Sequence, residues 1–192
     1  MRIGIDAGHG GLKNGVYQTK GKRSLHPVDG EVFYEGVNNR LYAKEWGALL
    51  EKYGHEVVYI VDPDDPTDVP LSTRVTIANS KDLDLLVSIH SNGAKSSKAR
   101  GHEVFTSIGE TKSDEYAEAW GKEFIDTFPD ITYRFGQGKA HDKEAKFTMV
   151  TATKCPAILI ELEFHTNDEA VRLMRSWDFR LKTGLCLCRA LK

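Results

Sequence analysis

The sequence predicts an α/β fold: one domain over residues 1–192, built on a mostly parallel, twisted sheet with helices on both faces. Short aliphatic or β-branched runs recur along the chain, and segments with apolar residues at helical spacing lie between them. Two of the runs, LLVSI and AILI, are almost continuously apolar, as in strands that are buried on both faces. The length of 192 residues suits a single domain with a substantial core.

Five of these runs are expected to form the strands of the sheet. Each is short, and polar or turn-forming residues bound it. Because parallel strands run in one direction, their carboxyl ends should meet at one edge of the sheet. The predicted strands are Arg2–Asp6, Glu56–Val61, Leu85–His90, His102–Thr106 and Ala157–Glu163.

Helical spacing of apolar residues predicts five helices. The strongest pattern spans Glu35–Tyr53, where aliphatic and aromatic residues share one face and Gly54 follows as a C-terminal stop. The other predicted helices are Leu71–Asn79 with Ser72 near its start, Ser113–Phe128 with Pro129 after its end, Val171–Arg175 and Phe179–Leu191.

Three connections stand out by their composition. Gly10–Tyr34 is rich in Gly, Lys and Asn, and Arg134–Lys146 is polar and interrupted by glycine, so both are predicted to be loops. Val61–Pro70 is expected to be an ordered surface turn between a strand and a helix. Loops at the carboxyl ends of strands build the ligand site of an α/β sheet, so the length of the first two favours a functional role.

Composition excludes several classes of partner and location. The net charge of -2 and pI near 6.4 argue against nucleic-acid binding. No apolar run approaches transmembrane length, so no membrane insertion is expected. Met1 leads directly into the first strand without a secretory signal, which predicts synthesis in the cytoplasm as a soluble protein. Of the three cysteines, Cys186 and Cys188 are expected to be small core residues, and no disulfide framework is expected.

Two histidines follow predicted strands. His9 lies in DAGHGG after the first strand, where flanking glycines allow the backbone to turn and aim the imidazole into a cleft. His90 ends the strand of SIHSN. Each has a structural alternative, since His9 could be exposed in a tight turn and His90 could be a satisfied structural histidine. Their shared context favours a metal site at the carboxyl ends of the strands.

A catalytic zinc site needs a further ligand. Three protein ligands and an open position for water are typical, and two histidines with one carboxylate are a documented set. Glu35 begins the long helix after the first loop, which fixes it on a rigid element near His9. The alternative is an acid that interacts with the helix macrodipole.

Two carboxylates end the most apolar strand, in PAILIELEF. Burying Glu161 there costs desolvation energy unless the carboxylate has a positive partner such as a metal or its bound water. Alternation along the strand puts Glu161 and Glu163 on the same side, so spacing leaves open which of them is catalytic.

Together these segments resemble the zinc-dependent N-acetylmuramoyl-L-alanine amidase family, which forms the catalytic domains of bacterial autolysins and phage endolysins. The resemblance covers nearly the whole chain. Each motif alone is weak, and their order and spacing together are specific. The motifs are DAGHGG, the Glu35 helix with Asn38 or Asn39 behind it, LSTRVTIAN, SIHSN, GHEVF and PAILIELEFHTN.

The resemblance implies a role for each candidate residue. His9, Glu35 and His90 match the family's ligands for one catalytic Zn²⁺, and Glu161 matches its essential glutamate, which resolves the choice that alternation left open. The family usually has glycine where this chain has Glu163. This departure could be a second acid, a substrate contact or a salt-bridged residue, and the last two are preferred.

Other residues near these motifs complete the predicted site. Asn92 follows His90 and, like Glu163, is expected to contact the substrate. His26 is a competing candidate ligand in the first loop, but its Lys, Arg and Pro neighbours argue against it. The remaining histidines receive no role; they are His55, His102, His141 and His165.

The resemblance implies hydrolysis of the amide between the lactyl group of N-acetylmuramic acid and the L-alanine of the stem peptide. Peptidoglycan is then the expected substrate, and a monomer is expected. A single catalytic domain without a cell-wall-binding domain or signal peptide favours a phage or prophage endolysin, which reaches the wall after membrane permeabilisation. Two alternatives stay open: a zinc hydrolase of another amide, such as a carboxypeptidase or deacetylase, and a non-catalytic wall-binding module.

Overall fold

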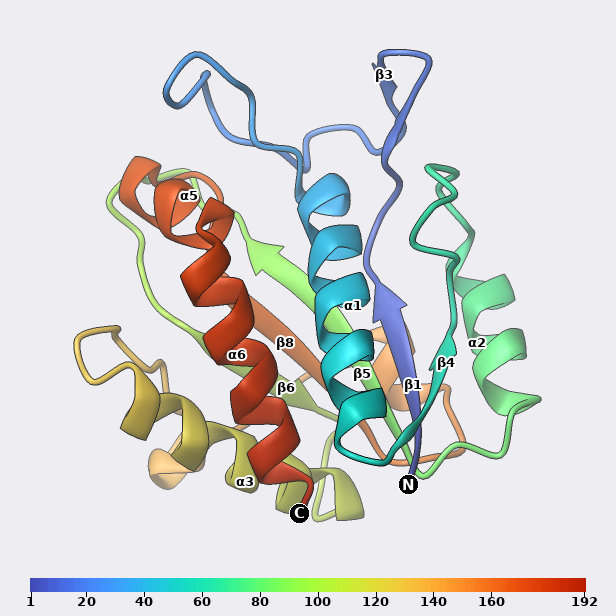
Figure 1. Ribbon diagram of the computed structural model, residues 1–192. Coiled ribbons are helices and arrows are strands. Elements are labelled where there is room, and N and C mark those ends of the chain that lie inside the picture. The colour runs from blue at the N-terminus through green and yellow to red at the C-terminus, as the bar shows by residue number, and fades with distance from the viewer.

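A six-stranded sheet forms the centre of the computed structural model, which describes residues 1–192 (Figure 1). Four strands run parallel, β6 is antiparallel to β8, and β7 pairs in parallel with β6 at the edge. The predicted mostly parallel α/β fold is therefore confirmed. In spatial order the strands are β4 (Glu56–Tyr59), β1 (Arg2–Ala7), β5 (Leu85–Asn92), β8 (Ala157–Phe164), β6 (Glu103–Thr106) and β7 (Lys143–Glu144).

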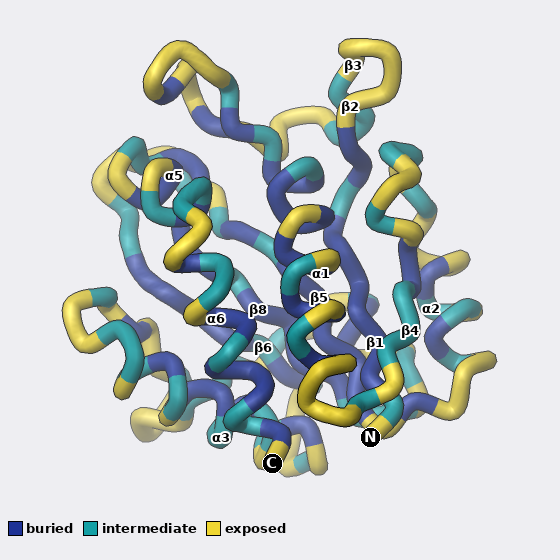
Figure 2. The backbone as a smooth tube through the Cα atoms, in the orientation of Figure 1, coloured by how far each residue is buried: buried dark blue, intermediate teal, exposed yellow.

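Helices cover both faces of this sheet. The larger core lies between the sheet and four helices: α1 (Glu35–Lys52), α3 (Lys112–Thr127), α5 (Asp168–Arg175) and α6 (Trp177–Ala190). A smaller core lies on the opposite face, under α2 (Leu71–Asn79) and α4 (Thr148–Thr151). The residues of β8 alternate between the two cores, as a strand covered on both faces requires. Figure 2 shows the central strands buried along most of their length.

The predicted elements are confirmed with shifted ends. β5 and β8 continue beyond their expected ends to Asn92 and Phe164. The third helix begins at Lys112 because Thr111 forms a capping box with Asp114, so Ser113 lies inside the helix and does not open it. The last two helices are longer than predicted, and side chains of Asn167 and Ser176 cap their first turns.

The two long segments predicted to be loops contain short elements. Gly10–Tyr34 includes a small antiparallel hairpin of β2 (Leu12–Lys13) and β3 (Val16–Tyr17), which stands above the carboxyl edge of the sheet in Figure 1. Arg134–Lys146 includes a single 3₁₀ turn, Gln137–Lys139, and the edge strand β7. Elements of two or three residues leave no periodicity in a sequence, which explains why they were missed.

All three cysteines are free, and Cys186 and Cys188 are fully buried in the larger core, as expected for small core residues. No helix is long and apolar enough to cross a membrane.

Candidate metal centre

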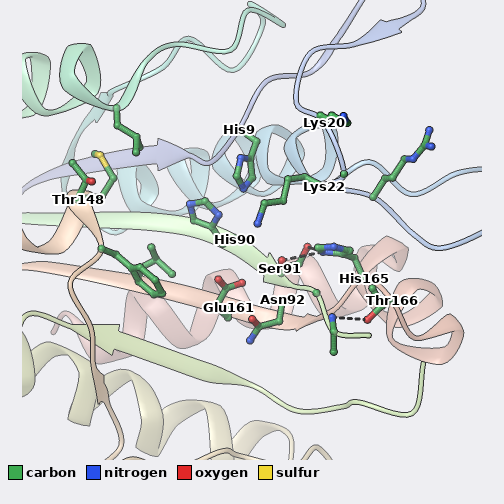
Figure 3. Close-up of a pocket in the computed structure, with 18 of the residues that line it drawn as sticks. His9, Lys20, Lys22, His90, Ser91, Asn92, Thr148, Glu161, His165 and Thr166 are labelled. Atoms are coloured by element: carbon green, nitrogen blue, oxygen red, sulfur yellow. Dashed lines mark hydrogen bonds between the residues drawn. The ribbon is translucent and has the colours of Figure 1, made fainter. Parts of the chain in front are cut away.

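The carboxyl ends of β1 and β5 bring His9 and His90 together. The two strands pair in parallel with Ala7 opposite Ile89, so both end at the same edge of the sheet. The imidazole rings lie 4.9 Å apart between centroids and are nearly perpendicular, at 89°. Figure 3 shows them beside each other on the wall of one pocket. The structure thus brings together the two histidines on which the metal prediction was based.

Glu35 joins this pair from the first turn of α1. Its Oε1 lies 3.3 Å from Nε2 of His9 and 3.0 Å from Nδ1 of His90, and it accepts a hydrogen bond of 3.1 Å from the backbone N–H of Ser91. The side chain is almost fully buried. Burial raises the pKa of Glu35, but the hydrogen bonds and charges of the two histidines outweigh it and hold this pKa well below its usual value.

The three residues meet the requirements of a metal centre. One donor atom from each of His9, Glu35 and His90 lies within 4.8 Å of the others. Oε2 of Glu35 is buried and accepts no hydrogen bond, so one carboxylate oxygen remains available to a positive partner. Two imidazoles and a carboxylate suit zinc and related divalent ions. This group can therefore hold a divalent metal ion.

The turn that carries His9 has an unusual backbone. His9 itself adopts a φ of +66°, in the left-handed region that non-glycine residues rarely occupy. Gly8 is required for a different reason: a Cβ there would lie 2.2 Å from the imidazole of His90. A Cβ at Gly36 would similarly lie 2.0 Å from the carbonyl oxygen of Gly10. Gly8 and Gly36 therefore permit close packing around the site, whereas Gly8 was expected to allow the backbone to turn.

Two buried arginines hold this turn in place. Nη1 of Arg40 and Nη2 of Arg74 both donate to the carbonyl oxygen of His9, over 2.7 and 3.1 Å. Arg74 also donates to the carbonyl of Ala7 and pairs with Asp6, both partners of this ion pair being almost fully buried. A left-handed residue of this kind costs roughly 1–3 kcal/mol and persists where its surroundings fix it. The arginines supply that constraint and set the direction of the imidazole.

Glu161 lies beside His90, on the adjacent strand of the sheet. The two residues are paired in the β5–β8 register, and both line the same cavity. Oε2 of Glu161 is buried and has no hydrogen-bond partner. Burial raises the pKa of Glu161 to about 8; the charge of His90 opposes this rise, and the carboxylate of Glu35 adds to it. A carboxyl group with a raised pKa and a free oxygen is suited to proton transfer.

These groups open into a cavity of about 860 Å³. Its walls come from residues 20–25 of the first long segment, from the end of β5 with the residues that follow it, and from residues 146–149 beside α4. Asn92 lines the cavity, and its Nδ2 is buried without an acceptor. This position suits the substrate contact that was predicted for Asn92.

Two residues singled out in the sequence lie outside the metal group and the cavity wall. Glu163 is almost fully buried, and its carboxylate accepts hydrogen bonds from Nε of Arg100 at 3.0 Å and the backbone N–H of Gly101 at 2.8 Å. The structure therefore favours the salt-bridge role for Glu163 and not the substrate contact, because its oxygens already have donors. His26 is turned toward Asp168, with Nε2 and Oδ1 3.1 Å apart.

His165, which received no role from the sequence, lies at the site. Its Nδ1 is 3.7 Å from Oε2 of Glu35 and 3.1 Å from Oγ of Ser91, and its ring stacks on Phe33. The side chain is 2% exposed and forms part of the cavity wall. The signal that could have found it is its place just after β8, the strand that pairs with the end of β5.

Comparison with known proteins identifies the family of this chain. The sequence model of the N-acetylmuramoyl-L-alanine amidase family matches residues 3–192. The chain belongs to this family. The match includes every residue of the metal group and Glu161, so the whole site lies within the amidase domain.

Individual amidases resemble the chain over most of their length. The N-acetylmuramoyl-L-alanine amidase AmiA of Escherichia coli (strain K12) is 26% identical over 95% of this chain and 72% of its own length. AmiA of Salmonella typhimurium is 24% identical over 97% of this chain and 73% of its own. The crystal structure of the N-acetylmuramoyl-L-alanine amidase from Clostridium difficile 630 has a TM-score of 0.81 and 25% identity, covering 99% of this chain and 94% of that one.

Proposed function

We propose that this amidase cleaves the amide between N-acetylmuramic acid and the L-alanine of the peptidoglycan stem peptide. In this proposal His9, Glu35 and His90 hold one Zn²⁺, and Glu161 is the catalytic carboxylate. The observation that carries it is the unpaired Glu161 oxygen in the same cavity as the grouped metal donors. Family membership supports the choice of bond, because the family and its relatives are named for that reaction.

The side chains divide the work of hydrolysis. When bound, zinc polarises a carbonyl and lowers the pKa of water to about 7. Glu161 accepts a proton from the attacking water and passes it to the leaving amine nitrogen. Asn92 donates its free Nδ2–H to an oxygen of the substrate. Arg40 and Arg74 keep His9 directed into the site through their bonds to its carbonyl oxygen.

Product analysis on defined muropeptides tests the bond that is cleaved. The metal-loaded protein should release a stem peptide with a new free L-alanine amine and no new reducing sugar ends, both measured by mass spectrometry and end-group assay. Cleavage of another amide would instead establish a carboxypeptidase or deacetylase. Binding to walls without any cleavage would establish a wall-binding module and refute the proposal.

Metal analysis tests the ligands. His90→Ala should lose most of the bound zinc, because two remaining donors hold the ion far more weakly than three. His26→Ala is the matched control, since that histidine pairs with Asp168 and should leave the metal content at one ion per chain. Undiminished zinc in His90→Ala, measured by elemental mass spectrometry, would remove His90 from the ligand set.

We also propose that the protein acts as a monomer on the bacterial cell wall, on its periplasmic or extracellular side. Light scattering coupled to gel filtration tests the monomer. The role as an endolysin stays a prediction; it requires that protein expressed in the cytoplasm lyse the cells only after the membrane is permeabilised. Lysis of the expressing cells while their membrane is still intact would contradict that requirement.

A further inference from the structure

Positive charge surrounds the candidate active site. Five of the 21 residues that line its cavity are Lys or Arg, whereas Glu161 is the only acidic one. The chain as a whole has 26 basic and 28 acidic residues, so the basic excess is local to the cavity. We call these five residues the cationic rim: Lys20, Lys22, Arg23, Lys95 and Lys146.

No carboxylate of the protein forms an ion pair with a residue of the cationic rim. All ion pairs of the structure involve other residues, and no side chain of the rim makes a hydrogen bond within the protein. Several other basic residues do have carboxylate partners, as Arg180 has Glu45 at 3.0 Å. Unpaired cations around a concave site produce a positive potential that attracts anions.

Lys22 brings this charge to the reacting groups. Figure 3 shows its side chain extending into the cavity toward His90, whereas Lys20 lies farther out. The carbonyl oxygen of Lys22 accepts a hydrogen bond of 3.0 Å from the N–H of Glu35, which ties this point of the loop to the start of α1. The ammonium group is therefore carried by backbone that is fixed to the metal group.

The cavity also contains a neutral donor without a partner, Nδ2 of Asn92. Lys22 and Asn92 together offer several N–H donors, and Glu161 is the one carboxylate acceptor that faces them. A ligand that satisfies these groups must be rich in acceptor oxygens and negatively charged.

We propose that the cationic rim binds carboxylates of the stem peptide, with Lys22 contacting a carboxylate close to the scissile amide, so that free-acid stems are preferred over amidated ones. This inference rests on the proposed function. The peptide side of the bond carries ionisable carboxylates, whereas the N-acetylated sugars are neutral. The position of Lys22 beside His90 places the recognised charge near the cleaved bond and not at a remote wall polymer.

Two defined muropeptides test the inference. They differ only in the residue after L-alanine, whose carboxylate is either free or converted to a carboxamide. The wild-type enzyme should have a kcat/KM about tenfold higher on the free acid, the size expected for one charge-assisted hydrogen bond. Lys22→Met should reduce that ratio to near one, and Lys22→Arg should restore part of it. Lys13→Met removes an exposed lysine outside the cavity and should keep the full ratio.

Each other outcome overturns the inference in a recognisable way. Equal wild-type rates on the two substrates would refute carboxylate recognition. An equal loss on both substrates in Lys22→Met would show that the lysine acts on the catalytic groups instead. A loss seen only on intact walls that carry anionic polymers would assign the rim to those polymers. Failure of the metal-loaded wild type to cleave either muropeptide would refute the proposed function, and the inference with it.

Discussion

Glu161 and Glu163 lie two residues apart on β8, and each has a buried carboxylate oxygen, but their surroundings are opposite. Glu163 accepts hydrogen bonds from Arg100 and from the backbone of Gly101. Glu161 has an oxygen with no donor and faces the cavity beside His90. The two residues lie on the same strand, so the hydrogen-bond partners distinguish the carboxylate that stabilises the fold from the one that is free to react.

The largest expected effect is on turnover. Glu161→Gln keeps the shape of the side chain and removes its ability to accept a proton, so kcat should fall by about 100- to 10,000-fold. Metal content should stay at one ion per chain, and the melting temperature should not fall, because no protein partner is lost. Muropeptide turnover, elemental analysis and calorimetry on the same preparation measure all three. Turnover close to that of the wild type would exclude Glu161 as the catalytic carboxylate.

The next largest effect is expected on stability, at the buried carboxylate of Asp6 on β1. Arg74→Met leaves Asp6 buried without its ion-pair partner and should lower the free energy of unfolding by roughly 3–5 kcal/mol. Arg172→Met is the control, since its pair with Asp29 is exposed and should change the free energy of unfolding far less. Urea unfolding measures both. Similar losses in the two variants would contradict the importance given to burial of the pair.

A smaller effect is expected from Glu163→Gln. The amide keeps the shape but weakens the bonds to Arg100 and Gly101, so the free energy of unfolding should fall by about 1–3 kcal/mol. Its kcat/KM should change far less than that of Glu161→Gln. A large loss of turnover with unchanged stability would reverse the roles assigned to the two carboxylates.

The last effect depends on pH and concerns His102, a buried group that must stay neutral. It stacks on Phe124 and accepts a hydrogen bond of 2.8 Å from Nε1 of Trp120. Burial lowers the pKa of His102 to about 3. Between about pH 6.5 and 3 the imidazole of His102 binds a proton in the unfolded chain but not in the folded chain. The free energy of unfolding should therefore decrease as the pH is lowered, by at most about 1.4 kcal/mol per pH unit.

His102→Phe tests this pH dependence, because it keeps the stacking and removes the titrating ring. Urea unfolding between about pH 4 and 7 should give a shallower fall in stability than in the wild type. An identical slope in the two proteins would show that other groups cause the acid sensitivity.

The sequence predicted the parts of this protein that follow from periodicity and strand order. Strand-end positions placed His9 and His90 at one edge of the sheet, and the family motif placed Glu35 and Glu161 beside them. Contacts between distant loops leave no such pattern. The pairing of Glu163 with Arg100 depends on how the segment after β5 folds back. The left-handed backbone of His9 also could not be predicted from the sequence, because Arg40 of α1 and Arg74 of α2 hold it through long-range hydrogen bonds.

The central place of β5 in the sheet has a consequence for assembly. β1 lies on one side of β5 and β8 on the other. The β1–β5 pairing brings His9 to His90, and the β5–β8 pairing brings Glu161 to His90. Both pairings join segments that are far apart along the chain and are parallel, which makes them slow to form. No partly folded sheet contains the complete site. The residues of the metal group need only the β1–β5 pairing and the start of α1, whereas Glu161 joins them through β8. Metal uptake therefore reports the first pairing, and turnover reports both.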